Sequence, residues 1–175
     1  MKEGVQERAR GVRLMIFDVD GVLTDGTLLY GPRGEELKSF FAHDGHGIKM
    51  LTASGVGCAL LSGRRSTAVA TRAAELGIET VFQGVEDKLE IFQQLIAQQR
   101  LTVQQTGYMG DEIVDLPVLT RCGFACAPRE APEAVRTRVH YVAEAAAGRG
   151  AVREVCELLM RAQSTFDRTL GKYLA

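Results

Sequence analysis

Two aspartates stand one residue apart at the end of an apolar segment. The segment Leu14–Phe17 is followed directly by Asp18 and Asp20, before Gly21. A short apolar run that ends near a glycine is typical of a buried strand, and side chains two residues apart on a strand share a face. Two such carboxylates repel each other unless one is protonated, hydrogen-bonded or close to a cation. A tight turn, in which Asp and Gly are common, is the simplest alternative to a functional pair.

Four more polar residues follow later strands or stand where helices are expected to start: Ser62, Lys88, Asp111 and Asp115. Ser62 offers a hydroxyl donor and Lys88 a positive charge, and both suit phosphate oxygens. Three of these residues also have an ordinary structural alternative. Ser62 and Asp111 could cap helices, and Lys88 could be a solvated surface charge. Their joint occurrence on alternate elements of one predicted sheet favours a functional interpretation.

Together, these groups supply what phosphoryl transfer requires, namely a nucleophile, an acid for the leaving oxygen, phosphate donors and a cation. Asp18 could attack phosphorus to form an aspartyl-phosphate, while Asp20 protonates the leaving alkoxide and later activates water. Carboxylate and carbonyl oxygens are hard ligands that suit Mg²⁺. Without a cation, an anionic nucleophile would face an anionic substrate, so we expect Mg²⁺ at this site.

The segments that position these residues alternate between strands and helices. Strands are expected at 14–17, 58–61, 81–82, 106–109, 123–126 and 139–142, and helices at 48–53, 67–76, 86–100, from 110 and at 151–162. This alternation predicts an α/β fold, a doubly wound, Rossmann-like parallel sheet flanked by helices, with ligands at the carboxyl edge. Residues 26–41 predict a projecting β-hairpin around a Gly/Pro turn. The distance from the first strand to Ser62 leaves no room for a cap domain.

His43 and His46 lie in a predicted loop before the helix at 48–53. Two histidines invite a metal interpretation, but without further ligands nearby we favour a structural role. We expect an N-terminal extension at 1–10, frayed and too polar for a signal peptide, one phosphatase domain at 11–163 and a tail at 164–175 whose order the pattern leaves open.

The composition excludes several classes of protein. The 175 residues suit one domain, and 21 basic against 22 acidic residues, a net charge of -1, show no excess that would indicate nucleic-acid binding. No apolar run is long enough to cross a membrane. The four cysteines have no zinc-site spacing, so we expect reduced thiols in a cytoplasmic protein: Cys58, Cys122, Cys126 and Cys156.

The order of the acidic, hydroxyl and lysine residues resembles the four motifs of the haloacid dehalogenase superfamily of phosphotransferases. The resemblance implies that Asp18 is the nucleophile and Asp20 the general acid/base. It also implies that Mg²⁺ is bound by Asp18, the carbonyl of Asp20 and Asp111, with Asp115 supporting the site through hydrogen bonds. Glu112 stands where the superfamily more often has Asp.

A narrower resemblance covers Leu14 to about Gln163. It rests on the following segments: Asp20–Gly26, Gly34–Phe40, Asp44–Ile48, Ser62–Arg64, Gln83–Gly84 and Gly148–Glu154. They are similar to those of capless phosphatases that act on 3-deoxy-D-manno-octulosonate 8-phosphate in lipopolysaccharide biosynthesis. The resemblance implies a small-molecule sugar phosphate as the substrate and a homotetramer whose hairpin and tail contribute to neighbouring sites. It also implies substrate contacts from these residues: His43, Asp44, Gly45, Lys49, Gly63, Arg64 and Arg72. The family often has Arg in place of His43.

Three alternatives remain open. Close relatives share these motifs and act on a nine-carbon acidic sugar 9-phosphate. Similar domains also serve as non-enzymatic tetramerisation units, although the intact Asp18, Asp20, Lys88 and Asp111 favour an enzyme. A phospho-accepting signalling receiver is a third alternative, and such a receiver has no need of a second aspartate for acid catalysis.

Overall fold

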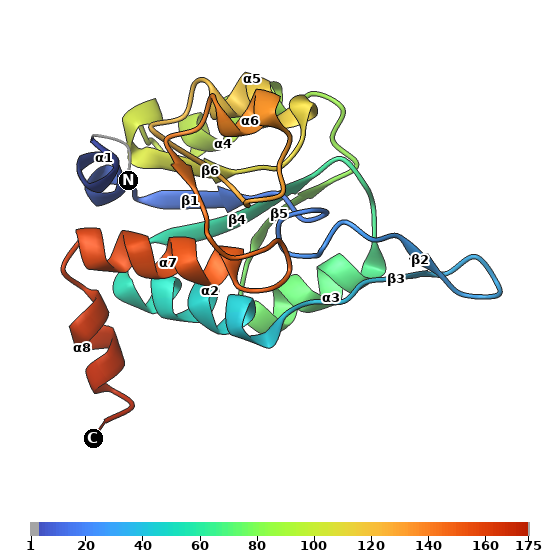
Figure 1. Ribbon diagram of the computed structural model, residues 1–175, viewed down its shortest axis with the longest axis horizontal. Coiled ribbons are helices and arrows are strands. Elements are labelled where there is room, and N and C mark those ends of the chain that lie inside the picture. The colour runs from blue at the N-terminus through green and yellow to red at the C-terminus, as the bar shows by residue number, and fades with distance from the viewer. Residues whose placement is uncertain (1–3, 175) are drawn as a thin grey trace.

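A parallel sheet of six strands, in the order β5-β4-β1-β6-β7-β8, forms the centre of the computed structural model, which describes residues 4–174 (Figure 1). The strands are β1 (Leu14–Phe17), β4 (Gly57–Ser62), β5 (Thr80–Gln83), β6 (Thr106–Met109), β7 (Phe124–Ala127) and β8 (Tyr141–Val142). All have bounds within two residues of the predicted ones, which confirms the doubly wound α/β fold.

Helices cover both faces of the sheet (Figure 1). One face carries α2 (Ala42–Ser54), α3 (Thr67–Leu76) and α7 (Ala151–Ala162), and the other carries α4 (Lys88–Gln98), α5 (Leu116–Leu119) and α6 (Glu133–Arg136). Each face has its own buried apolar cluster. None of the helices within residues 4–174 has the length and apolar character that a membrane span requires. The four cysteines are free thiols, as predicted.

The central strand β1 is buried along its whole length, which explains why its sequence is uniformly apolar. Its last residue, Phe17, pairs with Leu60 on β4 and with Met109 on β6. The chain runs outward from β1 through β4 to β5 and then crosses back to β6, so the strand order reverses beside β1. Ligands bind at such a switch point, at the carboxyl ends of the strands.

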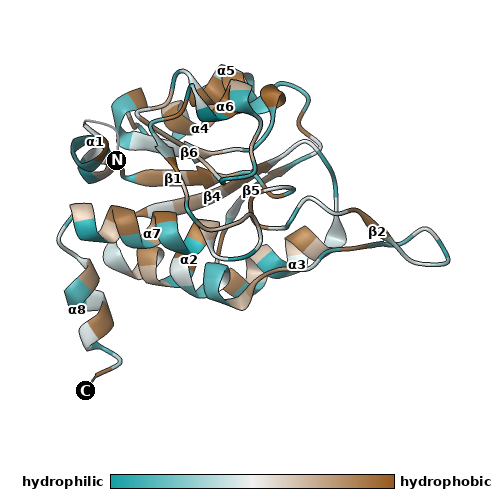
Figure 2. Ribbon diagram, viewed as in Figure 1, coloured by the Kyte–Doolittle hydropathy of each residue, from teal (hydrophilic) through white to brown (hydrophobic). Residues whose placement is uncertain are grey.

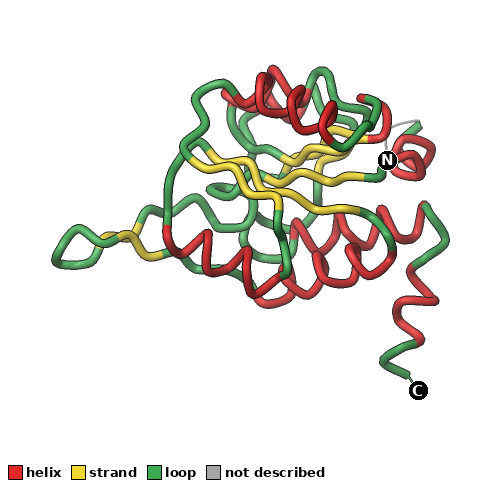
Figure 3. Tube along the Cα trace, turned by 180° about the vertical axis from the view of Figure 1, so that it is seen from behind, coloured by secondary structure: helices red, strands yellow, loops and turns green. Residues whose placement is uncertain are grey.

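The predicted hairpin is present and projects from the body of the molecule (Figures 1 and 3). Its strands β2 (Leu29–Tyr30) and β3 (Glu36–Leu37) are antiparallel. Four of its apolar side chains are exposed, and the brown of β2 in Figure 2 marks part of this surface: Leu28, Leu29, Tyr30 and Leu37.

Helix α2 begins at Ala42, whereas the sequence predicted a loop before residue 48. The reason is a tertiary contact with α7. The Asp44 carboxylate accepts hydrogen bonds from the backbone N–H groups of Gly150 (3.2 Å) and Arg153 (2.8 Å). A Cβ on Gly47 would come within 3.0 Å of the Arg153 Cα, so this glycine lets the two helices approach. Packing therefore overrides the low helix propensity of the glycines.

Both ends of the chain form helices. The expected frayed extension is wrong for its described part, which forms α1 (Val5–Gly11) and buries Val5 and Ala9. Near the other end, α8 (Phe166–Gly171) lies beyond α7, with Phe166 buried. Residues 1–3 and 175 of these two predicted segments lie outside the described residues.

Candidate active site

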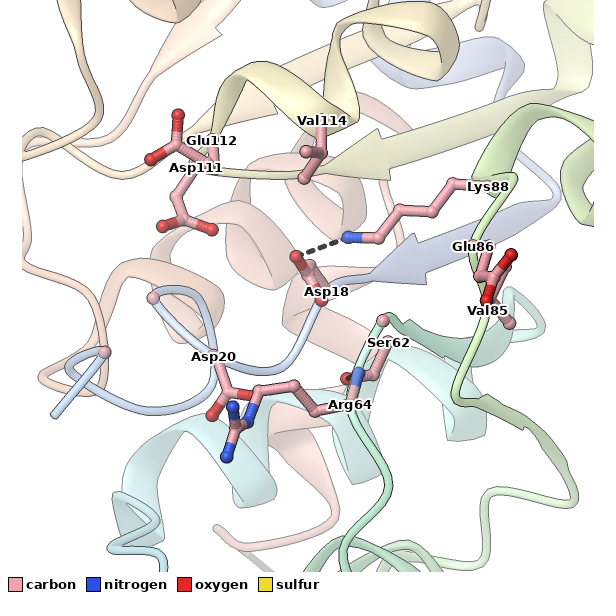
Figure 4. Close-up of a pocket in the computed structure, with 13 residues that line it drawn as sticks. Asp18, Asp20, Ser62, Arg64, Val85, Glu86, Lys88, Asp111, Glu112 and Val114 are labelled. Carbon is pink, nitrogen blue, oxygen red and sulfur yellow. Dashed lines mark hydrogen bonds and ion pairs between the residues drawn. The ribbon is translucent and has the colours of Figure 1, made fainter. Parts of the chain in front are cut away.

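A cavity of about 350 Å³ opens at the carboxyl edge of the sheet, next to the end of β1 (Figure 4). Its lining includes all the residues for which the sequence predicted chemistry except the buried Asp115, and also two of the predicted substrate contacts. The lining residues are Asp18, Asp20, Gly21, Gly26, Ser62, Gly63, Arg64, Val85, Glu86, Lys88, Asp111, Glu112 and Val114.

Asp18 lies at the floor of this cavity and is 6% exposed. Its backbone N–H donates to the Met109 carbonyl (2.9 Å), which continues the β1–β6 pairing by one residue. Its Oδ1 accepts the N–H of Val19 (2.7 Å), and its Oδ2 accepts from Lys88 Nζ (2.6 Å; Figure 4). The carboxylate is thereby held in one orientation at the strand end.

Lys88 is the first residue of α4, and Asp87 caps this helix by accepting the N–H groups of Leu89 and Glu90. The buried ammonium group reaches Asp18 and also Asp115 Oδ1, at 2.6 Å in both cases. Burial alone would lower the pKa of Lys88, but the charges of Asp18 and Asp115 outweigh it and raise that pKa. Lys88 is therefore a buried, charged donor at neutral pH and not a surface lysine.

Asp115 is fully buried and uses both of its oxygens within the protein. Oδ1 accepts from Lys88 and from the hydroxyl of Tyr108 (2.7 Å). Oδ2 accepts the backbone N–H groups of Asp111 and Glu112, both at 3.1 Å. This carboxylate thus holds Lys88 and the loop after β6 in place. Tyr108 was not predicted from sequence, although a tyrosine in a buried strand needs a hydrogen-bond partner.

Asp111 faces Asp18 across the cavity, and its Oδ1 is buried with no hydrogen-bond partner among residues 4–174. Burial, with the nearby charges of Asp18 and Asp115, raises its pKa to about 7. Burial and the charge of Asp115 likewise raise the pKa of Asp18 to about 6, although Lys88 opposes them. A Cβ on Gly21, which has φ +76°, would lie 2.0 Å from Asp111 Oδ2, so only glycine fits there.

The carboxylates of Asp18, Asp111 and Asp115 have ligand oxygens within 4.8 Å of one another. Each Asp115 oxygen already accepts two hydrogen bonds, whereas each Asp18 oxygen accepts one and Asp111 Oδ1 accepts none from the described residues. Asp18 and Asp111 are therefore the side chains that could hold a metal. The unpartnered Asp111 Oδ1 and the raised pKa values both indicate excess negative charge, which a divalent cation would neutralise. Hard oxygen donors of this kind fit Mg²⁺.

Asp20 lines the same cavity but has different partners. Its Oδ1 forms an ion pair with Lys38 Nζ, and Arg64 Nε lies 3.8 Å from its Oδ2. Arg64 also donates to Glu36 Oε1 and to the Tyr30 hydroxyl, both at 3.0 Å. Three hairpin residues that the sequence did not single out thus reach the site. The hairpin was predicted from its Gly/Pro turn, but the sequence does not indicate which of its side chains reach the cavity.

Ser62 ends β4 and is 2% exposed. Its Oγ accepts the backbone N–H of Arg64 at 3.2 Å, and its own hydroxyl proton is free to be donated into the cavity. Glu112, on the opposite wall, is exposed, and its carboxylate accepts the N–H of Ile113.

The remaining predicted substrate contacts do not line this chain's cavity. Asp44 is committed to α7, as described above. Arg72 pairs with Glu75 (3.1 Å) and would lie 2.1 Å from a Cβ on Gly45. The His43 ring packs against Phe41 with the ring planes tilted by 56° and the centroids 4.8 Å apart.

Lys49 lies in a separate surface groove between α2 and the end of α3. The cluster of possible metal ligands found within residues 4–174 contains only aspartates, so His43 and His46 take no part in it.

Comparisons with known proteins find relatives that match nearly the whole chain. No family model matches the chain. It is 40% identical over 169 residues to the 3-deoxy-D-manno-octulosonate 8-phosphate phosphatase KdsC of Yersinia pestis, an alignment that covers 97% of this chain and 90% of that protein.

Solved structures of other proteins also match nearly the whole chain. The 3-deoxy-D-manno-octulosonate 8-phosphate phosphatase of Moraxella catarrhalis, in complex with a magnesium ion, a phosphate ion and KDO, superposes with a TM-score of 0.96 at 35% identity and 99% coverage of both chains. A putative haloacid dehalogenase (HAD) superfamily hydrolase of Legionella pneumophila gives a TM-score of 0.94 at 36% identity and covers 97% of this chain and 93% of that one.

Proposed function

This chain belongs to the 3-deoxy-D-manno-octulosonate 8-phosphate phosphatase family of the haloacid dehalogenase superfamily, and we propose that it hydrolyses that sugar phosphate to the free sugar acid and phosphate in cytoplasmic lipopolysaccharide biosynthesis. The observation that carries the proposal is the arrangement around Asp18. Its carboxylate is held by Lys88, which Asp115 holds in turn, and it faces the unpartnered oxygen of Asp111. An anchored nucleophile beside a buried cation and a metal-type carboxylate suits phosphoryl transfer.

Asp18 attacks phosphorus, and the bond between phosphorus and the sugar oxygen breaks. Asp20, on the opposite side of the cavity mouth from Lys88 in Figure 4, gives its proton to that leaving oxygen. Asp20 then takes a proton from a water molecule that attacks the phosphorus of the aspartyl-phosphate. This second step releases phosphate and regenerates the Asp18 carboxylate.

The Asp18 and Asp111 carboxylates and the backbone carbonyl of Asp20 would hold Mg²⁺. When bound, the ion supplies positive charge between the carboxylates and the substrate phosphate. The Ser62 hydroxyl and the Lys88 ammonium group donate to the phosphate oxygens. Asp115 keeps Lys88 and the loop after β6 in position.

The sugar acid would meet Arg64 and Gly63 at the rim of the cavity. The Arg64 side chain is 43% exposed, so its guanidinium can turn from Glu36 to a substrate carboxylate, which it matches in a bidentate geometry.

We also propose a homotetramer in which the hairpin and the C-terminal tail contribute to neighbouring sites. The exposed apolar side chains of the hairpin, Leu28, Leu29, Tyr30 and Leu37, support this assembly. His43, Asp44, Gly45, Lys49 and Arg72 would contribute to substrate binding only in this assembly, because they do not line the cavity of their own chain.

A substrate panel at fixed Mg²⁺ tests the function. Phosphate release by the purified chain is measured with 3-deoxy-D-manno-octulosonate 8-phosphate, a nine-carbon acidic sugar 9-phosphate and glucose 6-phosphate. We expect the highest kcat/KM with the first. A higher value with the second would move the assignment to the nine-carbon substrate. Equal values on all three would refute a sugar-acid phosphatase, and no turnover would favour a tetramerisation domain.

A matched pair of variants tests the site. Asp18→Asn removes the nucleophile, whereas Asp25→Asn makes the same chemical change at an exposed position of the following loop that does not line the cavity. We expect loss of turnover for the first variant and wild-type turnover for the second, with both remaining folded by circular dichroism.

A further inference from the structure

Lys38 follows β3 of the hairpin, and its ammonium group lies between two carboxylates. Nζ forms one ion pair with Asp20 Oδ1 and another, 3.0 Å long, with Glu36 Oε1. The Lys38 side chain is only 1% exposed, although the adjacent Leu37 is 56% exposed. Burying an ammonium group is costly unless it is paired, so its two anionic partners hold it in this position.

Arg64 completes a network of four charges from the other side of the cavity mouth. Its guanidinium contacts Glu36 at 3.0 Å and lies beside Asp20 (Figure 4), with Nε 3.8 Å from Oδ2. Arg64 is far more exposed than Lys38 and can turn to a ligand, whereas the enclosed Lys38 keeps its contact with Asp20.

The two oxygens of Asp20 consequently differ. Oδ1 is occupied by Lys38, whereas Oδ2 is buried and has no hydrogen-bond partner among the described residues. A carboxyl group that transfers a proton needs one oxygen aimed at the reacting atom. Because Lys38 fixes Oδ1, it leaves Oδ2 as the oxygen that carries the proton and restrains rotation of the carboxyl group.

We propose that Lys38 is a positioning residue for Asp20: through its contact with Oδ1 it orients Oδ2 to donate its proton to the leaving sugar oxygen. The inference rests on the proposed function, since it takes Asp20 as the general acid. Lys38 acts through Asp20 and not on the substrate. It also gives the hairpin a part in the chemistry of its own subunit, independent of any contact with a neighbour.

Substrates with different leaving groups distinguish this positioning role from a merely structural one. A sugar alkoxide leaves poorly without a proton, whereas p-nitrophenolate is stable and leaves without one. The ratio kcat/KM covers the steps up to release of the leaving group and is independent of the later hydrolysis of the aspartyl-phosphate. A variant that misplaces the acid therefore loses kcat/KM on the sugar phosphate and keeps it on p-nitrophenyl phosphate.

The experiment compares Lys38→Met with the wild type on both substrates at saturating Mg²⁺. We expect kcat/KM to fall about 10- to 100-fold on the sugar phosphate and less than about threefold on p-nitrophenyl phosphate, since a misplaced acid loses part of a 10²- to 10⁴-fold contribution. Asp20→Asn is expected to show the same selectivity. Adding Lys38→Met to Asp20→Asn is expected to cause no further loss, because both changes remove one function.

The matched control is Arg129→Met, which removes an exposed ion pair with Glu130 (2.7 Å) away from the hairpin and the tail. We expect it to leave the ratio of the two kcat/KM values unchanged. Lys38→Gln, with a polar end group, is the second variant should Lys38→Met unfold, and Lys38→Arg is expected to restore part of the selectivity. Equal losses on both substrates, or no loss on the sugar phosphate, would overturn the proposal.

Measurements on the wild type distinguish a failure of this proposal from a failure of the proposed function. If it hydrolyses p-nitrophenyl phosphate but not the octulosonate phosphate, the substrate is wrong. The Lys38 variants are then tested with a primary alkyl phosphate that the wild type does hydrolyse. Their kcat/KM on this substrate is compared with their kcat/KM on p-nitrophenyl phosphate. If no alkyl phosphate is hydrolysed, Asp20 has no acid role and the proposal for Lys38 is overturned as well.

Discussion

Removing divalent cations should make the stability of the protein strongly dependent on pH. In the metal-free protein, the pKa of Asp111 is raised from 3.8 to about 7 and that of Asp18 to about 6. A carboxyl group whose pKa is raised by folding binds protons more tightly in the native state. Its contribution to stability is therefore complete below pH 4 and is lost as the pH rises through the folded pKa.

The size of this effect follows from the shifts. A pKa raised from 3.8 to about 7 corresponds to about 4 kcal/mol for a fully buried group, and the partial exposure of Asp111 reduces this to about 2–4 kcal/mol for the cluster. For a chain of this length, 1 kcal/mol shifts Tm by about 2–4 °C, so we expect Tm in EDTA to fall by about 5–15 °C between pH 5 and pH 8. Mg²⁺ should stabilise more at pH 8, because protons compete with it at pH 5.

Thermal unfolding by differential scanning fluorimetry, with EDTA or Mg²⁺ at both pH values, measures these differences. Asp111→Asn is the control. It removes the group with the higher of the two pKa values, so Tm in EDTA should depend less on pH. The same slope in the wild type and in Asp111→Asn, or equal stabilisation by Mg²⁺ at pH 5 and pH 8, would refute the electrostatic reasoning.

Three substitutions test the supporting contacts. Gly21→Ala places a Cβ 2.0 Å from Asp111 Oδ2, so we expect the Mg²⁺ concentration for half-maximal activity to rise about 10- to 100-fold; an unchanged value would contradict this. Tyr108→Phe removes one of four donors to Asp115, and urea titration should show a loss of about 1 kcal/mol, whereas a loss above about 4 kcal/mol would mean that the remaining donors do not hold Asp115. Asp44→Ala frees the N-terminus of α7, which should cost about 1–2 kcal/mol by urea titration. A fall in kcat/KM without any loss of stability would instead make Asp44 a substrate contact.

The sequence was informative wherever a residue follows directly from its strand. Asp18, Ser62 and Asp111 come just after or at the end of β1, β4 and β6, and parallel strands bring their carboxyl ends to one edge. Lys88 could be placed in the same way because Asp87 caps α4, which starts at that edge. Local pattern and sheet topology were sufficient for these residues.

Contacts between distant segments could not be predicted in this way. Lys38 and Asp20 are 18 residues apart, and their meeting depends on where the end of the hairpin lies relative to the end of β1. Asp44 and Arg153 are 109 residues apart, so the extension of α2 through two glycines follows from the packing of α7 and not from propensity. The burial of α1 depends on similar partners, including the side-chain amide of Gln163, which donates to the Ala9 carbonyl.

If Asp18 is the nucleophile, it becomes phosphorylated during turnover. The most direct test is to quench the enzyme with acid during steady-state hydrolysis of the octulosonate phosphate, reduce it with borohydride, which converts an aspartyl-phosphate to homoserine, and map the modified residue by peptide mass spectrometry. We expect homoserine at position 18 in the wild type, more of it in an Asp20→Asn variant supplied with p-nitrophenyl phosphate, and none in Asp18→Asn. Modification at another residue, or wild-type turnover by Asp18→Asn, would show that Asp18 is not the nucleophile.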